Sequence, residues 1–278
     1  MSMAEKMFRV GFGGFSRLVP TQASNVARKL MMSPRKGTPK SWELDMPEPD
    51  RELALGNETH LSIWQGGPLK VLFVHGWEGR VSQFAPLLGR LDRSLFTFYA
   101  VHPPGHGMSA APESHPGKFI EAVRAALAFI GEPVHAAIGH SMGAGVLCYV
   151  QAHDRSIERL VLISGPAHFH GILTRFSAFL GLGALAEKRF LASVESHVGI
   201  AISDLDMTGL AEHITQPVMI VHDLEDKEIP FSEALQLHQR FPSCHLLETR
   251  ALGHRRILQG DEVVERIDGF LCGFIGDL

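Results

Sequence analysis

Apolar and polar positions alternate with two different periods from about residue 50 onward. Lys70–His75 is a short continuous apolar run, which is typical of a strand buried on both faces of a parallel sheet. Ser82–Leu91 then has apolar residues at helical spacing. Further strands are predicted at Leu95–Val101, Val134–Ile138, Leu160–Ser164, Pro217–His222 and Cys244–Glu248, and further helices at Lys118–Ile130, Met142–His153, Phe231–Phe241 and Glu262–Ile275.

A hairpin is predicted ahead of this series. Glu52–Leu55 and Thr59–Trp64 are two short strand-like runs, and Gly56-Asn57 between them favours a tight turn. Strands that alternate with helices indicate an α/β protein with a parallel sheet covered on both faces. The crossovers in such a sheet are right-handed.

One interval breaks the alternation. About fifty residues separate Ser164 from Pro217, far more than a crossover between parallel strands needs. They are apolar with helical spacing and contain no strand of their own. We interpret residues 167–213 as a helical cap over one end of the sheet, with an extra pair of core helices as the alternative.

Composition places the chain among ordinary globular proteins. It has 278 residues, of which 45% are apolar and 20% charged, so one or two domains are expected. Disordered, collagenous and disulfide-framework classes are thereby excluded. The three cysteines have no CxxC spacing and are expected to be reduced. No apolar stretch reaches the ~20 residues of a membrane span, and we find no signal-peptide core, so a cytoplasmic location is the default expectation.

Charge is concentrated in the first forty residues. They carry eight lysines and arginines and one acid, a net charge of +7, which leaves −11 for the rest of a chain whose total is −4. We interpret residues 1–45 as a basic, partly helical arm ahead of the main α/β domain at 46–278. Peripheral contact with an anionic membrane stays open, as do packing on the acidic remainder and a homodimer. No motif indicates nucleic-acid binding.

Gly139–Gly143 has the pattern G-x-S-x-G, centred on Ser141. An apolar strand leads into it and a helix-like segment leaves it, which is the setting of a nucleophile elbow. The two glycines have a steric reason, because side chains there would collide with the neighbouring strand and helix. The alternative is a small-residue helix start capped by Ser141.

A serine needs a base and an acid that orients the base. His254 follows the last predicted strand and precedes the final helix, which makes it the favoured base among sixteen histidines. The loop after Pro217–His222 offers three acids. Asp226 is preferred, with Glu225 and Asp223 behind it, because Asp223 is expected to hold the turn by an Asx-type bond.

Two backbone N–H groups are needed to stabilise an oxyanion. We expect one from Met142, directly after the nucleophile, and one from Trp77 in the glycine-rich loop after Lys70–His75. Substrate contacts are expected from His75 and Gly76 in that loop and from Phe169 and Phe176 in the cap.

These motifs together resemble the α/β-hydrolase superfamily over roughly residues 52–278. The resemblance implies a sheet of about eight mostly parallel strands, a lid after the sixth strand, and hydrolysis by a triad of Ser141, Asp226 and His254. His102 stands where many members have Asp, at a position that is usually structural. The motifs that carry the resemblance are His75-Gly76, Pro104–Ser109, Gly139–Gly143, Asp226 with Ile229-Pro230, and Gly253-His254.

The predicted function is therefore hydrolysis of carboxylic esters with small to medium apolar acyl groups. A thioesterase, a carbon–carbon bond hydrolase, an acyltransferase and an inactive binding protein on the same scaffold are the alternatives, since fold alone does not decide among them. Nothing in the sequence calls for a cofactor. His168 and His170 have no third ligand at a fitting spacing, so no metal is expected, and we interpret both as cap residues lining or covering the pocket.

Overall fold

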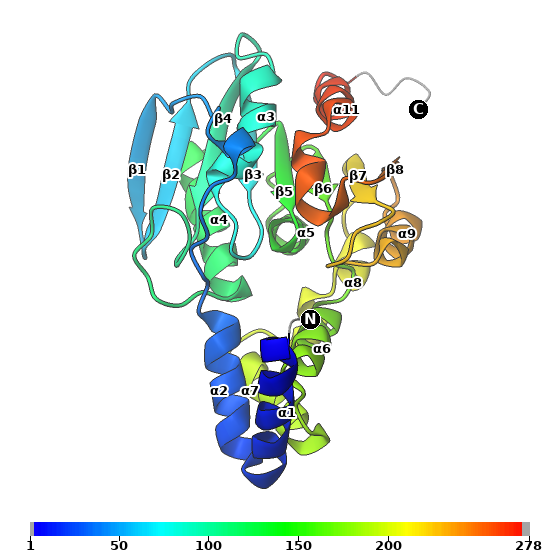
Figure 1. Cartoon of the computed structure of the whole chain (residues 1–278). Coiled ribbons are helices and arrows are strands. Elements are labelled where there is room, and N and C mark those ends of the chain that lie inside the picture. Colours follow the sequence, from blue (N-terminus) through cyan, green and yellow to red (C-terminus); the bar gives the residue numbers. More distant parts are fainter. Residues whose placement is uncertain (1–2, 274–278) are drawn as a thin grey trace.

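An eight-stranded sheet forms the centre of the protein (Figure 1). The computed structural model describes residues 3–273, without the side chains of residues 4–6. The spatial strand order is β1-β2-β4-β3-β5-β6-β7-β8, with all pairs parallel except those that involve β1 and β2. The strands are β1 Arg51–Gly56, β2 Thr59–Trp64, β3 Leu69–Val74, β4 Phe96–His102, β5 Ala136–His140, β6 Leu160–Ile163, β7 Val218–Asp223 and β8 Cys244–Thr249. The predicted α/β class with a mostly parallel sheet is confirmed.

Helices cover both faces of the sheet, and β3 shows why its sequence is continuously apolar. Val71 and Phe73 point into one core cluster, whereas Leu72 and Val74 point into another. The first cluster is closed by α3 and α11 and the second by α4, α5 and α9. These helices are α3 Ala85–Arg90, α4 Pro116–Ile130, α5 Met142–Asp154, α9 Phe231–Arg240 and α11 Asp261–Leu271; shorter turns are η1 Ser41–Glu43, η2 Val81–Phe84, α10 Gly253–Arg256 and η4 Ile257–Gln259.

Some boundaries differ from the predicted ones. The strand predicted at Val134–Ile138 is β5 at Ala136–His140, because Val134 forms only an isolated bridge with Ile157. The hairpin turn lies at Asn57 and Glu58, both with positive φ, one residue later than predicted. The helix predicted at Ser82–Leu91 is divided into η2 and α3, and the predicted end of the last helix lies partly outside the described residues.

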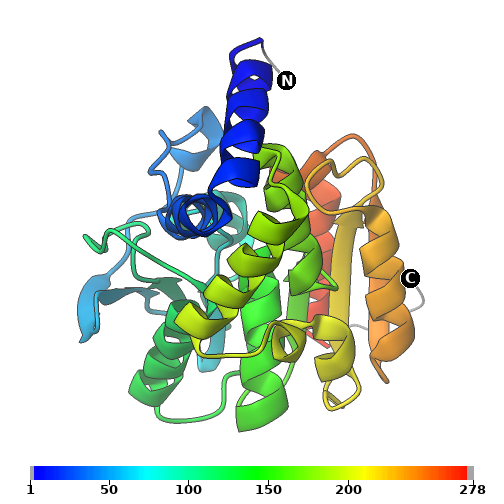
Figure 2. The same ribbon diagram turned by 90° about the horizontal axis from the view of Figure 1, so that it is seen from below.

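A layer of helices lies beyond the carboxyl ends of the parallel strands (Figures 1 and 2). Between β6 and β7 the chain forms α6 Phe169–Leu180, α7 Ala184–Val198, η3 Ile202–Leu205 and α8 Met207–Ala211, within the interval interpreted as a cap. Two N-terminal helices, α1 Met3–Leu18 and α2 Pro20–Met32, join this layer. Ala23 and Ala27 of α2 are fully buried, and α2 packs along α7. Residues 3–32 thus form part of the cap layer.

The connection between β5 and α5 requires backbone contact with β3. A Cβ atom added to Gly143 would overlap the carbonyl oxygen of Val74, and one added to Gly139 would lie 2.7 Å from Cα of Ala144. These are the collisions that the two glycines were expected to avoid. Gly145, one turn into the same helix, has no atom nearer than 3.8 Å to such a Cβ.

Gly143→Ala is therefore expected to destabilise the fold by about 3 kcal/mol or more, because the obstacle is backbone and cannot rotate away. Gly145→Ala is the matched control and is expected to stabilise by up to about 1 kcal/mol, since alanine favours helix. Urea unfolding of the two variants measures both changes. Equal stabilities would show that the contact between β3 and α5 is not as tight as described.

Candidate active site

Ser141 occupies the sharp turn between β5 and α5 in a strained conformation. Its backbone φ of 54° and ψ of −119° lie in a region that residues other than glycine rarely adopt. The backbone holds it there, because Ser141 N–H donates to the carbonyl of Ile163 at 2.8 Å and Ala144 N–H donates to the Ser141 carbonyl at 3.0 Å. Gly76 approaches closely from the neighbouring loop, since a Cβ on it would lie 2.8 Å from Cβ of Ser141. The turn thus has nucleophile-elbow geometry.

His254 and Asp226 meet as predicted from their order along the chain. The distance from His254 Nδ1 to Asp226 Oδ2 is 2.8 Å, and the Asp226 side chain is fully buried. Asp226 Oδ1 also accepts hydrogen bonds from the backbone N–H groups of Glu228 and Ile229. With Nδ1–H donated to the carboxylate, His254 Nε2 is left as the acceptor nitrogen.

The electrostatics of Asp226 favour its ionised form. Burial alone would raise the pKa of this carboxyl, but the hydrogen bond and charge of His254 and the two backbone N–H donors lower the pKa to about 2. Asp226 therefore carries a negative charge throughout the neutral range and can stabilise a positive imidazole. His222 lies on its other side, with Nε2 at 3.5 Å from Asp226 Oδ2, and donates to the Ile229 carbonyl at 3.0 Å.

The competing acids have different surroundings. Asp223 Oδ2 accepts hydrogen bonds from the Thr249 hydroxyl at 2.8 Å and from Leu252 N–H at 3.0 Å, and Oδ1 accepts from Glu225 N–H at 3.0 Å. Asp223 thus forms the Asx-type bond expected of it and also holds the loop that leads to His254. Glu225 is exposed. Only Asp226 of the three contacts His254.

Ser141 and His254 line one cavity of about 480 Å³ beneath the cap. Among the described residues, no hydrogen bond joins Ser141 Oγ to His254. His254 Nε2 lies 3.9 Å from Glu228 Oε2, and Glu228 also lines the cavity. Ser141 and His254 therefore share a cavity without a hydrogen bond between their side chains.

The cavity wall is mainly apolar. Phe169 and Phe176, both expected to contact substrate, line it. Met31 and Met32 line it as well, although they belong to α2, and sequence reasoning missed them because only tertiary packing brings them there. The apolar lining residues are Met31, Met32, Phe169, Ile172, Leu173, Phe176 and Phe179. Charged residues also line the cavity, and they include Arg35, Arg175, Lys227 and Arg255.

His75, which we expected to contact substrate, does not line the cavity. Its imidazole is fully buried, donates from Nδ1 to the Gly76 carbonyl, and packs against His106 and Phe119 outside the cavity. Burial holds its pKa well below the usual value for histidine. Gly76 does not line the cavity either, and its role in the structure is the close approach to Ser141.

Two backbone N–H groups next to Ser141 are available to an oxyanion. Among the described residues, neither Trp77 N–H nor Met142 N–H donates to a protein acceptor, and both residues line the cavity. The loop of Trp77 is fixed by a hydrogen bond from Gly79 N–H to the Gly76 carbonyl and another from Glu78 N–H to His106 Nε2. Glu78 has a φ of 54°, which turns the loop sharply.

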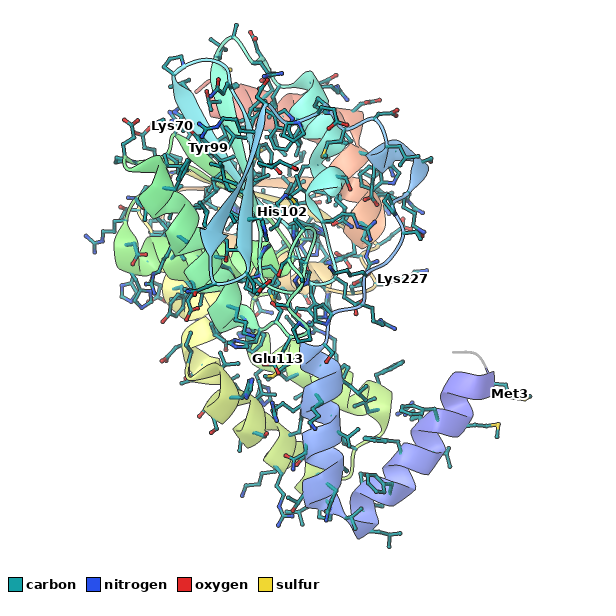
Figure 3. The ribbon with its side chains drawn as sticks, turned by 90° about the vertical axis from the view of Figure 1, so that its left-hand side faces the viewer. Met3, Lys70, Tyr99, His102, Glu113 and Lys227 are labelled. Carbon is teal, nitrogen blue, oxygen red and sulfur yellow. The ribbon has the colours of Figure 1, made fainter. Side chains whose placement is uncertain are left out.

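Other histidines serve structural roles. His102, where the superfamily often has Asp, contacts the Ser62 hydroxyl through Nε2 at 2.8 Å, and its position is visible in Figure 3. His140 donates from Nε2 to the His254 carbonyl at 2.7 Å, and this hydrogen bond helps to fix the backbone at His254. His168 immediately precedes α6, and its Nδ1 lies 3.3 Å from Asp206 Oδ2; it does not line the cavity, and whether it covers the cavity stays a prediction.

One group of side chains could hold a metal ion. Glu113, His115 and His197 have ligand atoms within 4.8 Å of one another. Arg28 Nη1 lies 3.1 Å from His197 Nδ1, however, and fixes the tautomer that donates from Nε2 to Glu113. This arrangement opposes a cation and instead ties α2 and α7 to the loop before α4. Figure 3 shows Glu113 at the junction of the two layers.

Comparison with known proteins supports this interpretation of the fold. A model of the α/β hydrolase fold matches residues 70–184. A monoacylglycerol lipase from Paleococcus ferrophilus is similar, with a TM-score of 0.62 and 18% identity over 77% of this chain and 98% of that one. Also similar is an esterase from Thermogutta terrifontis, with a TM-score of 0.59 and 16% identity over 77% of this chain and 94% of that one. A bromoperoxidase from Bacillus anthracis has a TM-score of 0.60 and 16% identity over 77% of this chain and 95% of that one. A search of curated proteins found no match.

The match over residues 70–184 and the similar solved structures show that the chain has the α/β-hydrolase fold. Identities of 16–18% show the fold alone, so the reaction has to be argued from the site. Among the described residues, no helix is both long and apolar enough to cross a bilayer.

Acid is expected to destabilise this protein through its buried imidazoles. Burial lowers the pKa of His102 and His106 to about 4 and that of His140 to about 3. The unfolded chain takes up these protons near pH 6.5, so the free energy of unfolding falls as the pH drops from about 6.5 toward 4. Each histidine adds a slope of up to about 1.4 kcal/mol per pH unit.

Urea unfolding between pH 7 and pH 4.5 measures that slope. His102→Gln is expected to flatten it by about one proton, and substitution of the exposed His153 by Gln is the control. Identical slopes for the two variants would contradict the assignment of His102 as a neutral buried group.

Proposed function

We propose that this protein is a serine hydrolase that cleaves carboxylic esters through an acyl-enzyme. The observation that carries the proposal is the buried contact between Asp226 and His254, together with the position of His254 in the wall of the cavity that the strained Ser141 also lines. Strain of this kind costs of order 1–3 kcal/mol and persists where a function requires it. It favours a catalyst over an inactive binding protein on the same scaffold.

The first half of the reaction forms the acyl-enzyme. His254 Nε2 accepts the proton of the Ser141 hydroxyl as Oγ attacks the ester carbonyl, and Asp226 stabilises the imidazolium that results. The negative charge on the carbonyl oxygen is stabilised by the N–H groups of Trp77 and Met142. His254 then gives its proton to the departing alcohol, which leaves Ser141 acylated.

The second half repeats the same proton transfers with water as the nucleophile. His254 removes a proton from water as its oxygen attacks the acyl carbon, and the acid is released when Ser141 Oγ leaves with the proton from His254. Asp226 stays ionised throughout, since its pKa of about 2 is far below that of an imidazolium. His140, bonded to the His254 backbone, keeps the base in position.

The cavity favours an apolar acyl group of small to medium size. Its volume of about 480 Å³ and its wall of Phe, Leu, Ile and Met side chains suit an alkyl or aromatic group. Similar solved structures include a monoacylglycerol lipase and an esterase, which agrees with ester hydrolysis. Thioester cleavage uses the same groups, and comparing ester with thioester substrates separates the two.

A fluorophosphonate probe is expected to label Ser141 covalently, because it reacts with activated serines and mimics the tetrahedral intermediate. Mass spectrometry of a digest locates the adduct. Ser141→Ala should abolish labelling, whereas Ser114→Ala, at a serine that lines the same cavity, should retain it. A folded protein that carries no adduct on Ser141 would exclude the proposed mechanism.

Ester turnover provides the matching kinetic test. Ser141→Ala and His254→Ala are each expected to lower kcat by at least about a thousandfold, and the double variant should lose little more, because the residues act as a unit. Asp226→Asn is expected to lower kcat strongly by favouring the wrong tautomer of His254.

Acyl-chain preference is expected to be graded. Each buried methylene contributes up to about 0.8 kcal/mol, so kcat/KM should rise up to about fourfold per methylene from acetyl esters until the cavity is filled. Phe176→Ala, which enlarges the cavity, should move the optimum toward longer chains, whereas Phe129→Ala, at an exposed site outside the cavity, should not. A flat series from acetyl to octanoyl nitrophenyl esters would contradict an acyl site here.

A further inference from the structure

Helix α1 presents its apolar side to solvent. Met3, Met7, Val10 and Leu18 are 80%, 70%, 77% and 83% exposed. At 3.6 residues per turn, these four side chains form one stripe along the helix, which we call the outer stripe. Phe8 and Phe15, also exposed, lie beside it. A surface helix ordinarily buries such a stripe and leaves its polar face in water.

The inner side of α1 is formed by the buried Gly13 and Ser16 together with the partly buried Phe12, and it fits the cap closely. A Cβ on Gly13 would lie 2.8 Å from the carbonyl oxygen of Gly181. Ser16 Oγ accepts a hydrogen bond from Gly183 N–H at 2.9 Å and donates to the Gly13 carbonyl at 2.8 Å. Turning the outer stripe inward would break these contacts, so the reversed orientation is part of the fold.

The charge of the segment identifies what covers the outer stripe. Residues 1–40 carry a net charge of +7, and Arg9 and Arg17 are exposed on α1. A second copy of the chain would bring the same positive charge to the contact and would be repelled. An anionic bilayer supplies negative headgroups to the basic residues and an apolar layer to the outer stripe.

The position of α1 is also suited to a bilayer. Figure 3 shows α1 leaning away from the domain, with Met3 at its outer end. With 16 residues, α1 is about 24 Å long, shorter than the ~30 Å hydrocarbon core, so it would lie along a membrane surface rather than cross it. It packs on the end of α6, whose Phe179 lines the cavity and is 49% exposed.

We propose that α1 is an interfacial anchor that binds an anionic lipid bilayer through its outer stripe. This inference is independent of the proposed ester hydrolysis. It attaches the cap layer to the lipid surface and places one wall of the cavity beside the bilayer.

Co-sedimentation of the full chain with vesicles tests the anchor. Vesicles of phosphatidylcholine with about 30% phosphatidylserine are compared with vesicles of phosphatidylcholine alone. The protein should bind the anionic vesicles at least tenfold more tightly. The double variant Met7→Glu, Val10→Glu should lose at least tenfold in binding. The matched control Leu95→Glu, Phe129→Glu, which changes two exposed apolar residues elsewhere, should bind like the unaltered protein.

Two results would overturn the proposal. One is equal sedimentation of the unaltered protein and the double variant at low salt. The other is a dimer, seen by analytical ultracentrifugation, that the double variant abolishes while no form of the protein binds vesicles. Turnover of a water-soluble short-chain ester is measured on the same samples, and circular dichroism verifies folding. Ester hydrolysis without vesicle binding would reject the anchor but not the proposed hydrolase activity. Vesicle binding without ester hydrolysis would reject only the proposed hydrolase activity.

Discussion

The backbone contact between β3 and the start of α5 is the constraint on which the site depends. Because Gly143 lies against the Val74 carbonyl, α5 begins immediately beside the central strands, and Ser141 has to turn through a conformation with positive φ. The same proximity brings Gly76 against Ser141 and sets the Trp77 and Met142 N–H groups next to one side chain. Close packing of the sheet against α5 thereby fixes the position of Ser141.

Local periodicity was sufficient to predict much of this fold. A strand such as β3 is buried on both faces, so its apolar run reflects its surroundings directly, and Ser141, Asp226 and His254 could be located because each follows a predicted strand. The partners of α2 could not be predicted. Met31 and Met32 line the cavity through contacts with a helix more than a hundred residues away, and no local pattern encodes such packing.

The surroundings of the histidines could not be predicted from the sequence either. His75 and His254 both follow strands and both have glycine neighbours, yet one is buried under His106 and the other borders the cavity. The difference arises from the loops that close over each ring after the chain has folded. His222 was likewise undistinguished in the sequence, although it lies beside Asp226 in the structure. Residue type and strand position therefore predict which side chains meet at the end of the sheet better than they predict the contacts that support them.

The cap layer is assembled from two segments, residues 3–32 and 169–211, that are synthesised far apart in time. When α2 emerges from the ribosome, α7 has not yet been synthesised. More than 150 further residues must be added before the buried face of α2 can pack on α7. Closing so long a loop is slow relative to local helix formation. The part of the cavity wall that α2 contributes can therefore form only after α7 has been synthesised, when most of the chain has already been made.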